Sequence, residues 1–479
     1  MRKHLPAVLA TSLFLALGIY LIAISRGFVE MDEVTHYLQA RYAPRRPFLY
    51  ASVWARPLFT ILYTLPAQIS FSAARCFTLL IAALAAWIAY RLACAKGIGY
   101  AFTAVILTVS QLRYIQQCQT VMTEHLLALL LIGALYFWET ERRALSCAVM
   151  SLTPLARPEG VFLGPLWFVL VLLDRTSSIA TRARRTAILL MGPLLWFVIS
   201  WAGTGSPTWF VPNFPWSEQA RWGIGDFFDY TLRLPKFASW PILILGLAGI
   251  AVIRRYHLQK VYLMVGFLFL GHSVLRSGGF FGSAGYLRYL IPISPLLGIG
   301  ASAGLAAILS TASRLHVPVR RAVLATLFAA GIFTYAISLR LYPIPFPPER
   351  AEAHELRRIG EFLATRITSS TVVYCADLHF YLITDRDPWN FGLSNTELLA
   401  YVQHDQLVLR ELLAGLPVGS YVIYDDTWMR GFMGVTEEDL RRSGYTSVPT
   451  GGQEPAPTER AAMGMFTLLV KTIAEKNVP

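Results

Sequence analysis

The sequence predicts a mainly α, polytopic membrane protein: a bundle of about 11 transmembrane helices followed by a small extracytoplasmic α/β domain. Hydrophobic residues make up 55% of the 479 and charged residues only 15%, whereas soluble globular chains carry about 25% charged residues. Apolar runs recur through the first 340 residues and then give way to alternating strand-like and helix-like patterns. We therefore expect a transmembrane module at residues 1–340 and an outer domain at residues 341–479.

Seven apolar runs are clear candidates for spans, because each approaches the length that a helix needs to cross about 30 Å of hydrocarbon. They are Leu5–Ile24, Phe77–Leu92, Val121–Trp138, Ala187–Trp201, Val261–Leu275, Tyr286–Leu309 and Ala322–Leu339. The less clean candidates are Ile98–Ser110, Leu145–Ala156, Val161–Leu173 and Trp240–Ile253. No small-x-small cleavage pattern closes the first run, so we expect a retained span there instead of a signal peptide.

Positive charge is concentrated in the short connectors of the transmembrane module. The chain carries a net charge of +13, and residues 1–339 hold 29 Lys and Arg against 11 Asp and Glu. By the positive-inside rule these connectors are cytoplasmic. The pattern predicts a multi-pass plasma-membrane protein with a cytoplasmic N-terminus and an extracytoplasmic C-terminal domain. No nucleic-acid partner is needed to explain the charge.

Most carboxylates of the transmembrane module fall on the opposite, outer side of the predicted bilayer. Carboxylates near hydrocarbon are costly and tend to be functional, so their positions are informative. Those in outer loops or at outer span ends are Glu30, Asp32, Glu33, Glu124, Glu159, Glu218, Asp226 and Asp229. Their convergence on one face predicts a shared site at the outer membrane surface.

The segment MDEVTHYLQARY, residues 31–42, follows almost directly on the first span. As a helix it places Asp32 and His36 on one face, four residues apart. A carboxylate beside the bilayer surface can take a proton from an incoming hydroxyl, with His36 or an arginine tuning its pKa. Alternatively, Asp32 or Glu33 caps a short interfacial helix and the other polar residues are solvated.

Three further motifs lie at outer span ends, and each also has a purely structural interpretation. VMTEHLLALLL places Glu124 at the start of a span, where the helix dipole favours a carboxylate. LARPEGVF joins Arg157 and Glu159 at a helix break, either as a self-neutralising pair or with the arginine directed at a lipid-linked phosphate. GYLRYLIPISP places Arg288 just inside a span end. There the arginine either binds substrate or extends its charged group to the membrane surface by snorkelling.

Several other chemistries have no supporting motif in the sequence. The five cysteines are scattered and odd in number, which argues against a disulfide framework. Neither an HExxH motif nor a Gly-rich phosphate loop occurs. Asp377, His379, Asp425 and Asp426 follow predicted strands of the outer domain, where aspartate commonly makes turns.

The outer-face motifs resemble those of the membrane-embedded GT-C glycosyltransferases, above all the branch of protein O-mannosyltransferases and aminoarabinose transferases. The resemblance covers about residues 1–340. It rests on MDEVTHYLQARY, VMTEHLLALLL, the hairpin TPLARPEGVFLGPL, the outer loop GTGSPTWFVPNFPWS and the span YLRYLIPISPLLG. VWARPLF, which contains Arg56, is also similar to mannosyltransferases that build lipid-linked glycans.

The resemblance implies an inverting transferase that uses a sugar carried on a polyprenyl phosphate. It implies Asp32 as the general base, with Glu33 as the second candidate. Arg157 and Arg288 would be candidates for binding the donor phosphate, and Arg56 would bind the donor phosphate or another part of the substrate. The acceptor hydroxyl belongs to a protein, a lipid or a glycan, and membrane lipid surrounds the bundle.

Further residues are assigned to the substrate site by the same resemblance. Glu124 would orient His36 or an acceptor group, and Glu159 would contribute to substrate binding. The sequence requires no cofactor, and it leaves open a divalent metal bound by Asp32, His36 and Glu124.

The main alternative is a polytopic transporter or lipid-carrier flippase of the cell envelope. That function predicts charged or broken segments at the bilayer midplane and related repeats between the two halves, and the sequence displays neither. A membrane-anchored scaffold would leave the outer carboxylates unexplained. A ligase that moves whole glycans from a polyprenyl carrier is the nearest alternative enzyme.

Overall fold

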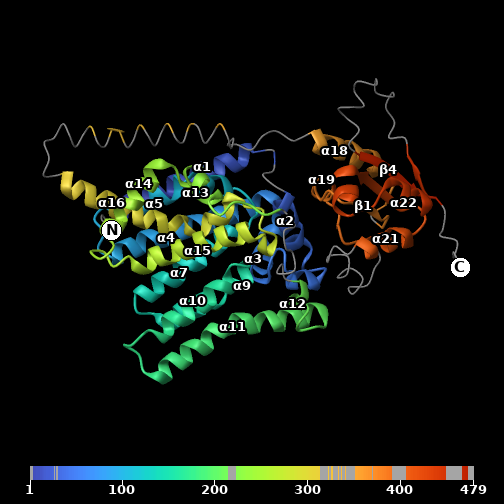
Figure 1. The fold of residues 1–479 in the computed structure, drawn as a ribbon. Helices are drawn as coiled ribbons and strands as arrows, with labels where there is room; N and C mark the ends of the chain where they lie inside the picture. The colour runs from blue at the N-terminus through green and yellow to red at the C-terminus, as the bar shows by residue number, and fades with distance from the viewer. Residues whose placement is uncertain are drawn as a thin grey trace.

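The computed structural model describes residues 4–25, 27, 31–213, 223–312, 351–368, 370–390, 406–448 and 466–472, with scattered positions between 322 and 340. Figure 1 shows a bundle of long helices and, beside one end of it, a smaller domain of short helices and strands. The described elements up to residue 312 are all helical, and the strands all follow residue 372.

The helical part runs from an N-terminal helix to a long helix that ends at Ala312. Its elements are α1 (Leu5–Ile24), α2 (Met31–Tyr42), η2 (Pro47–Ala51), α3 (Pro57–Ile69), α4 (Phe71–Ala95), α5 (Thr103–Val109), α6 (Leu112–Gln117), α7 (Glu124–Glu139), α8 (Arg143–Ser151), α9 (Thr153–Ala156), α10 (Gly160–Leu172), α11 (Ile179–Thr204), α12 (Phe210–Asn213), α13 (Asp229–Ala238), α14 (Trp240–Ala251), α15 (Gln259–Gly278), η4 (Phe280–Gly282), η5 (Leu287–Ile293) and α16 (Ser294–Ala312).

Several of these helices are long and apolar enough to cross a bilayer, as a multi-pass membrane protein requires. Among the described residues there are five such spans, or six if the bent pair of α13 and α14 counts as one. The five are Leu5–Ile24, Phe71–Ala95, Ile179–Thr204, Gln259–Gly278 and Leu287–Thr311. The count of about 11 spans stays a prediction, and most of Ala322–Leu339 lies outside the described residues.

Two of the less clean candidates form shorter or interrupted helices. Within Ile98–Ser110 the helix α5 has seven residues, which is far too short to cross a bilayer alone. Gly97 and Tyr100 both have positive φ, so the chain turns sharply before α5 begins. Leu145–Ala156 is divided between α8 and α9.

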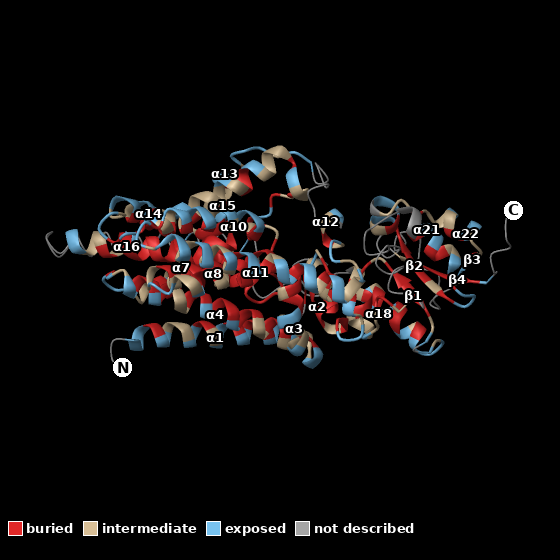
Figure 2. Cartoon of the chain, turned by 90° about the horizontal axis from the view of Figure 1, so that it is seen from below, coloured by how far each residue is buried: buried red, intermediate tan, exposed pale blue. Residues whose placement is uncertain are grey.

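Apolar side chains on the outer helices face away from the protein. Leu190, Leu194 and Val198 of α11 are each more than half exposed, and Figure 2 shows exposed residues along α1 as well. Exposed apolar helix faces of this kind are what a lipid environment stabilises. The inner helices instead meet through small residues: a Cβ at Gly304 of α16 would lie 2.0 Å from the carbonyl oxygen of Leu245 in α14.

A small α/β unit, which we call the α/β domain, follows residue 350. It comprises α18 (Ala351–Ala364), β1 (Val373–Cys375), α19 (His379–Thr384), α21 (Gln406–Gly415), β2 (Tyr421–Asp425), η6 (Asp426–Phe432), α22 (Glu437–Arg442), β3 (Tyr445–Ser447) and β4 (Phe466–Lys471). The described strands form one sheet in the order β1-β2-β4-β3. β1 and β2 are parallel, whereas β4 is antiparallel to both of its neighbours. All four strands lie in the part of the chain where the sequence shows alternating strand-like and helix-like patterns.

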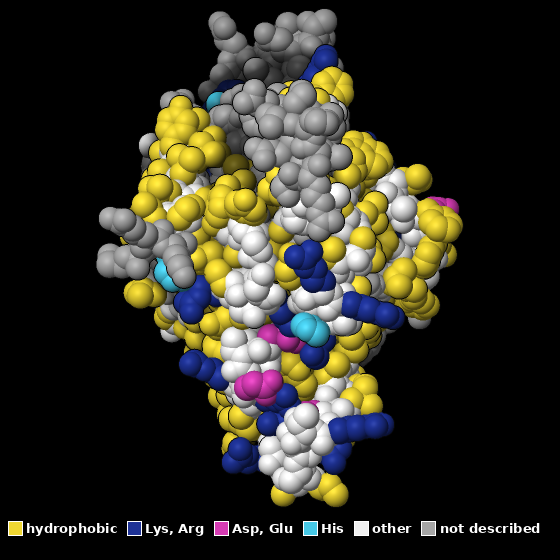
Figure 3. Space-filling view, turned by 90° about the vertical axis from the view of Figure 1, so that its left-hand side faces the viewer, with side chains coloured by type: hydrophobic (Ala, Val, Ile, Leu, Met, Phe, Trp, Pro, Cys, Tyr) yellow, Lys and Arg dark blue, Asp and Glu magenta, His cyan; other side chains and the backbone are white. Residues whose placement is uncertain are grey.

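Basic connectors meet at the end of the bundle remote from the α/β domain. Lys96 after α4 and Lys260 of α15 both contact Glu139 at the end of α7. Arg143 and Arg185 likewise share Asp174. Figure 3 views this end of the molecule and shows Lys and Arg side chains spread among hydrophobic ones. Segments far apart in the sequence therefore place their positive charge together, as the positive-inside interpretation expects.

Candidate active site

Helix α2 carries the first candidate residues and lies at the end of the bundle nearest the α/β domain (Figure 1). Asp32 and Glu33 occupy its first turn and Arg41 its last turn, an arrangement that matches the helix dipole. Val34 and Leu38 are buried and anchor the helix, which packs against α3. With 12 residues, α2 is too short to cross a bilayer by itself.

Asp32 forms an ion pair with an arginine that is 256 positions away in the sequence. Its Oδ2 accepts a hydrogen bond of 2.5 Å from Nη2 of Arg288 in η5. The guanidinium of Arg288 also lies over the ring of Tyr286, 4.7 Å from its centroid. The Asp32 side chain is 27% exposed and that of Arg288 only 5%, so the carboxylate is the more accessible partner.

The Asp32–Arg288 pair is one end of a buried chain of alternating charges. Nε of Arg288 lies 3.4 Å from Oε1 of Glu124, and the same oxygen lies 2.8 Å from Nη1 of Arg157. Arg157 in turn donates two hydrogen bonds, of 3.0 and 2.9 Å, to the two carboxylate oxygens of Glu159. Buried charges are tolerated when they are paired in this way. Three carboxylates and two guanidinium groups thus form what we call the ion-pair network: Asp32, Arg288, Glu124, Arg157 and Glu159.

The break between α9 and α10 positions the inner end of this network. Arg157 is the C-cap of α9 in extended conformation, and Glu159 is the N-cap of α10. Gly160 permits the close approach of the two helices, because a Cβ there would lie 2.1 Å from the carbonyl carbon of Thr153. Nη1 of Arg157 also donates to Oγ1 of Thr123, at 2.7 Å. Arg157 and Glu159 are therefore both a pair at a helix break and members of the network.

Glu33 lies in different surroundings from its neighbour Asp32. It is fully buried and accepts two hydrogen bonds from Arg75 of α4, of 2.7 and 3.1 Å. The backbone N–H of Val121 donates a third, of 3.2 Å. Arg75 also donates to the carbonyl oxygen of Gly27. These bonds tie α2 to α4 and to the segment before α7, which favours a structural role for Glu33.

His36 is buried and is held by the backbone. Its Nδ1 lies 3.2 Å from the carbonyl oxygen of Val121, so this nitrogen carries the proton. Burial, with smaller contributions from Arg157 and Arg56, lowers the pKa of His36 to about 3, although the hydrogen bond to Val121 acts in the opposite direction. The side chain is therefore neutral at physiological pH. Glu124 contacts Arg157 and Arg288, and its role in orienting His36 or an acceptor group stays a prediction.

The three residues that the sequence leaves open as metal ligands do not converge. Among the residues that the structure describes, no group of three or more His, Cys, Asp and Glu side chains could hold a metal ion. Asp32 and Glu124 are instead bridged by Arg288. The side chains present therefore do not fit the metal set proposed from Asp32, His36 and Glu124.

Arg56 has an unusual backbone conformation close to His36. Its φ of 72° and ψ of 146° lie in a region that non-glycine residues rarely adopt, at a cost of about 1–3 kcal/mol. The residue is buried and stands directly before Pro57, the first residue of α3. Such strain clusters at binding sites, where the surrounding structure holds a side chain in place.

Comparisons with known proteins bear on this arrangement. No protein-family model matches the sequence, and no curated protein is significantly similar to it. Among solved structures, ArnT from Cupriavidus metallidurans bound to undecaprenyl phosphate has a TM-score of 0.63 at 13% identity, with 98% of each chain covered. The chain has the fold of ArnT. The apo state of ArnT is similar too, with a TM-score of 0.61 at 13% identity, covering 96% of this chain and 97% of that one.

The ArnT fold confirms the resemblance inferred from the motifs. ArnT is an aminoarabinose transferase of the GT-C superfamily, the branch that the outer-face motifs indicate. The match extends over nearly the whole chain, so it includes the α/β domain, which the motif resemblance does not cover. At 13% identity the likeness concerns the fold alone.

Two residues of the site, Arg75 and Tyr289, are not among the candidates that the sequence motifs indicate. Arg75 lies two residues before the apolar run that begins at Phe77 and belongs to none of the sequence motifs, although a charge beside such a run is itself a functional or structural signal. Tyr289 lies beneath both network arginines, with its ring centroid 5.5 Å from Arg157 and 5.6 Å from Arg288. Its ring also stacks on His272 at 5.7 Å. The position of Tyr289 beside Arg288 in the sequence was the available signal.

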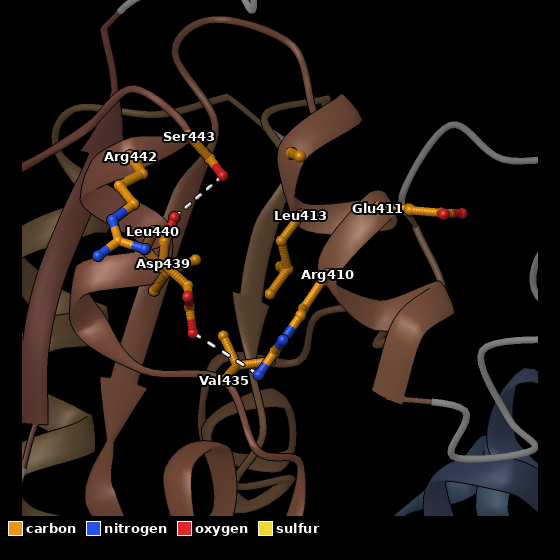
Figure 4. A pocket seen from close by; sticks show the side chains of 9 residues that line it. Arg410, Glu411, Leu413, Val435, Asp439, Leu440, Arg442 and Ser443 are labelled. Atoms are coloured by element: carbon orange, nitrogen blue, oxygen red, sulfur yellow. Dashed lines mark hydrogen bonds and ion pairs between the residues drawn. The ribbon is translucent and has the colours of Figure 1, made fainter.

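The α/β domain contains a pocket of its own, apart from the ion-pair network. It has a volume of about 310 Å³ and lies between α21 and α22 (Figure 4), where Arg410 and Asp439 face each other.

Asp377 and Asp425 of this domain act at turns, as expected. Asp377 accepts a hydrogen bond from the backbone N–H of His379, and Asp425 accepts one from the backbone N–H of Trp428. These residues do not join the ion-pair network.

Proposed function

We propose that this protein is an integral-membrane glycosyltransferase. It moves a sugar from a polyprenyl-phosphate donor to an acceptor hydroxyl on the outer face of the membrane, with inversion. The observation that carries the proposal is the Asp32–Arg288 pair at the accessible end of the ion-pair network, on a fold shared with ArnT. The ArnT neighbour was crystallised with undecaprenyl phosphate, which supports a polyprenyl carrier here.

The proposed reaction needs one base and several cations. Asp32 takes the proton of the acceptor hydroxyl as its oxygen attacks the anomeric carbon. The new C–O bond forms while the bond to the phosphate oxygen breaks, and the polyprenyl phosphate leaves with the bonding electrons. Because the polyprenyl phosphate leaves as a dianion, it needs positive charge near the phosphate more than protonation.

Three buried arginines supply the positive charge in this proposal. Arg288 and Arg157 belong to the ion-pair network, and Arg56 lies near His36. Guanidinium groups suit phosphate oxygens because their planar donors bind in pairs. When a donor phosphate binds Arg288, that arginine has less attraction left for Asp32. Donor binding therefore releases the base that the empty site holds in an ion pair.

Burial supports the assignment of Asp32 as the base. It raises the pKa of Asp32 to about 6, the nearby Glu124 contributes in the same direction, and Arg157 opposes both. A carboxylate with a raised pKa is a stronger proton acceptor, and it is still ionised at neutral pH. Glu33 is less available to take a proton from an acceptor, because it is fully buried and its two oxygens already accept three hydrogen bonds.

A transporter or flippase remains the alternative, and one observation favours it. α13 and α14 form a broken pair bent by 107°, a feature that transporters use at the bilayer midplane. However, α14 contains no charged residue, and the ion-pair network involves neither helix. The buried charges are therefore better explained by a transferase site.

The decisive experiment is transfer of radiolabelled sugar from polyprenyl phosphate in reconstituted vesicles. Asp32→Asn is expected to lower kcat by about 10²–10⁴-fold, the typical contribution of a general base, while donor binding persists. Glu141→Gln is the matched control, because Glu141 is exposed at the opposite end of the bundle. An Asp32→Asn variant with wild-type turnover would overturn the assignment of the base.

A further inference from the structure

Helix α2 has a second contact, at the end opposite Asp32. Nη2 of Arg41 lies 2.6 Å from Oδ1 of Asp385, which ends α19 in the α/β domain. The same guanidinium donates from Nη1 to the hydroxyl of Tyr37 and to the carbonyl oxygen of Ala67 in α3, at 3.0 and 3.1 Å. Arg41 thus joins α2, α3 and the α/β domain.

The segment that follows α19 extends this contact. Nε of Arg46 lies 3.3 Å from Oδ2 of Asp387. The rings of Tyr42 and Trp389 meet edge to face with centroids 6.3 Å apart, and both residues are only 5% exposed. We call this contact the α2 clamp, formed by Arg41, Tyr42 and Arg46 on one side and Asp385, Asp387 and Trp389 on the other.

The aromatic pair is the energetically important part of the clamp. The Asp385 side chain is 70% exposed, and ion pairs between solvent-exposed side chains contribute little to stability. Burial of a tryptophan ring contributes more, because aromatic side chains carry the largest apolar area of any residue. Loss of Trp389 should therefore loosen the clamp more than loss of either aspartate.

Helix geometry connects the clamp to Asp32. Ten residues separate Asp32 from Tyr42, a rise of about 15 Å at 1.5 Å per residue. A hydrogen-bonded helix of this length moves as one body, so a shift at its C-terminus changes the position of Asp32 against Arg288. Misplacement of a reacting group by about 1 Å can cost a hundredfold in rate.

We propose that the α/β domain positions the general base through the α2 clamp. Trp389, Asp385 and Asp387 are positioning residues in this proposal, which rests on the proposed function. The domain then contributes to catalysis from outside the membrane module without touching the substrate. Turnover, and not donor affinity, depends on the clamp.

The test compares full-length Trp389→Ala with Trp389→Phe in the radiolabelled transfer assay. Trp389→Ala is expected to lower kcat about tenfold and to leave KM for the donor and the acceptor within twofold. Trp389→Phe keeps an aromatic ring and should restore most of kcat. Asp385→Asn removes one charge at a left-handed position that asparagine tolerates, and should lower kcat about two- to threefold.

A readout without turnover separates this proposal from the proposed function. Hydrogen exchange of the α2 amides should be faster in Trp389→Ala than in wild type, with α4 unchanged. Glu438→Gln is the matched control, because its exposed pair with Arg442 lies in the same domain and not in the clamp. If exchange responds but wild type transfers no sugar, the clamp stands and the transferase function fails.

Two results would overturn the positioning role. In the first, Trp389→Ala keeps both wild-type kcat and wild-type exchange of α2. In the second, only KM for the acceptor rises, which would make the α/β domain an acceptor-binding module instead.

Discussion

The Asp32 side chain is partly exposed and its pKa is raised. The rate of sugar transfer should therefore depend on pH. The Asp32 pKa of about 6 means that the carboxylate is protonated below that pH and cannot accept a proton from the acceptor. We expect kcat/KM to rise as pH increases through about 6 and to level off above 7, since this parameter reports the free enzyme. Initial rates between pH 4.5 and 8 measure the profile. A flat profile across this range would contradict Asp32 as the base.

Glu33 and Arg75 form a buried pair whose disruption should affect stability more than chemistry. Removal of one partner leaves an uncompensated buried charge, which costs about 3–5 kcal/mol. We expect Glu33→Gln to lower the thermal unfolding temperature of the purified protein clearly. Because the unpaired charge of Arg75 causes this loss, the double variant Glu33→Gln/Arg75→Met should recover much of the unfolding temperature.

The same pair offers a direct check on the choice of base. A Glu33→Gln variant that folds as stably as wild type and has lost all turnover would identify Glu33 as the catalytic carboxylate. A variant that is destabilised but retains turnover per folded molecule would support its structural role.

At the scale of elements, the break between α9 and α10 matters most, because it holds Arg157 and Glu159 together. We expect Gly160→Ala to reduce the yield of folded protein or to weaken donor binding, since the new Cβ would collide with the backbone at Thr153. Gly164→Ala is the matched control in α10, with no heavy atom within 4 Å of its Cβ. Purification yield and donor affinity of the two variants measure the effect. Equal behaviour of both would show that the break tolerates a side chain.

At the scale of the whole molecule, the position of the basic connectors predicts orientation. Cys94 is exposed and lies beside Lys96 at the basic end, whereas Ser447 is exposed in the α/β domain. We expect a membrane-impermeant maleimide to label Ser447→Cys in intact cells, and Cys94 only after permeabilisation. Labelling of Cys94 in intact cells would reverse the topology and move the proposed site to the cytoplasmic side.

Composition and local pattern alone determined much of this protein. A high apolar fraction, basic connectors and one-sided carboxylates predict a multi-pass membrane protein with a separate α/β domain, and short motifs indicate the GT-C fold. These are local properties, because helix periodicity and span length depend on residues close in the sequence. Asp32, Glu124, Arg157, Glu159 and Arg288 are candidates on the same grounds.

Only the tertiary structure decided which of these residues are partners. Adjacent carboxylates Asp32 and Glu33 look equivalent in the sequence, but one pairs with Arg288 and the other with Arg75. The contact of Trp389 with α2 likewise cannot be predicted from the local sequence pattern. Ion pairs and aromatic contacts between distant segments depend on how whole helices pack, and the energy of a charge depends on its burial and its partner. Neither quantity is a property of local sequence.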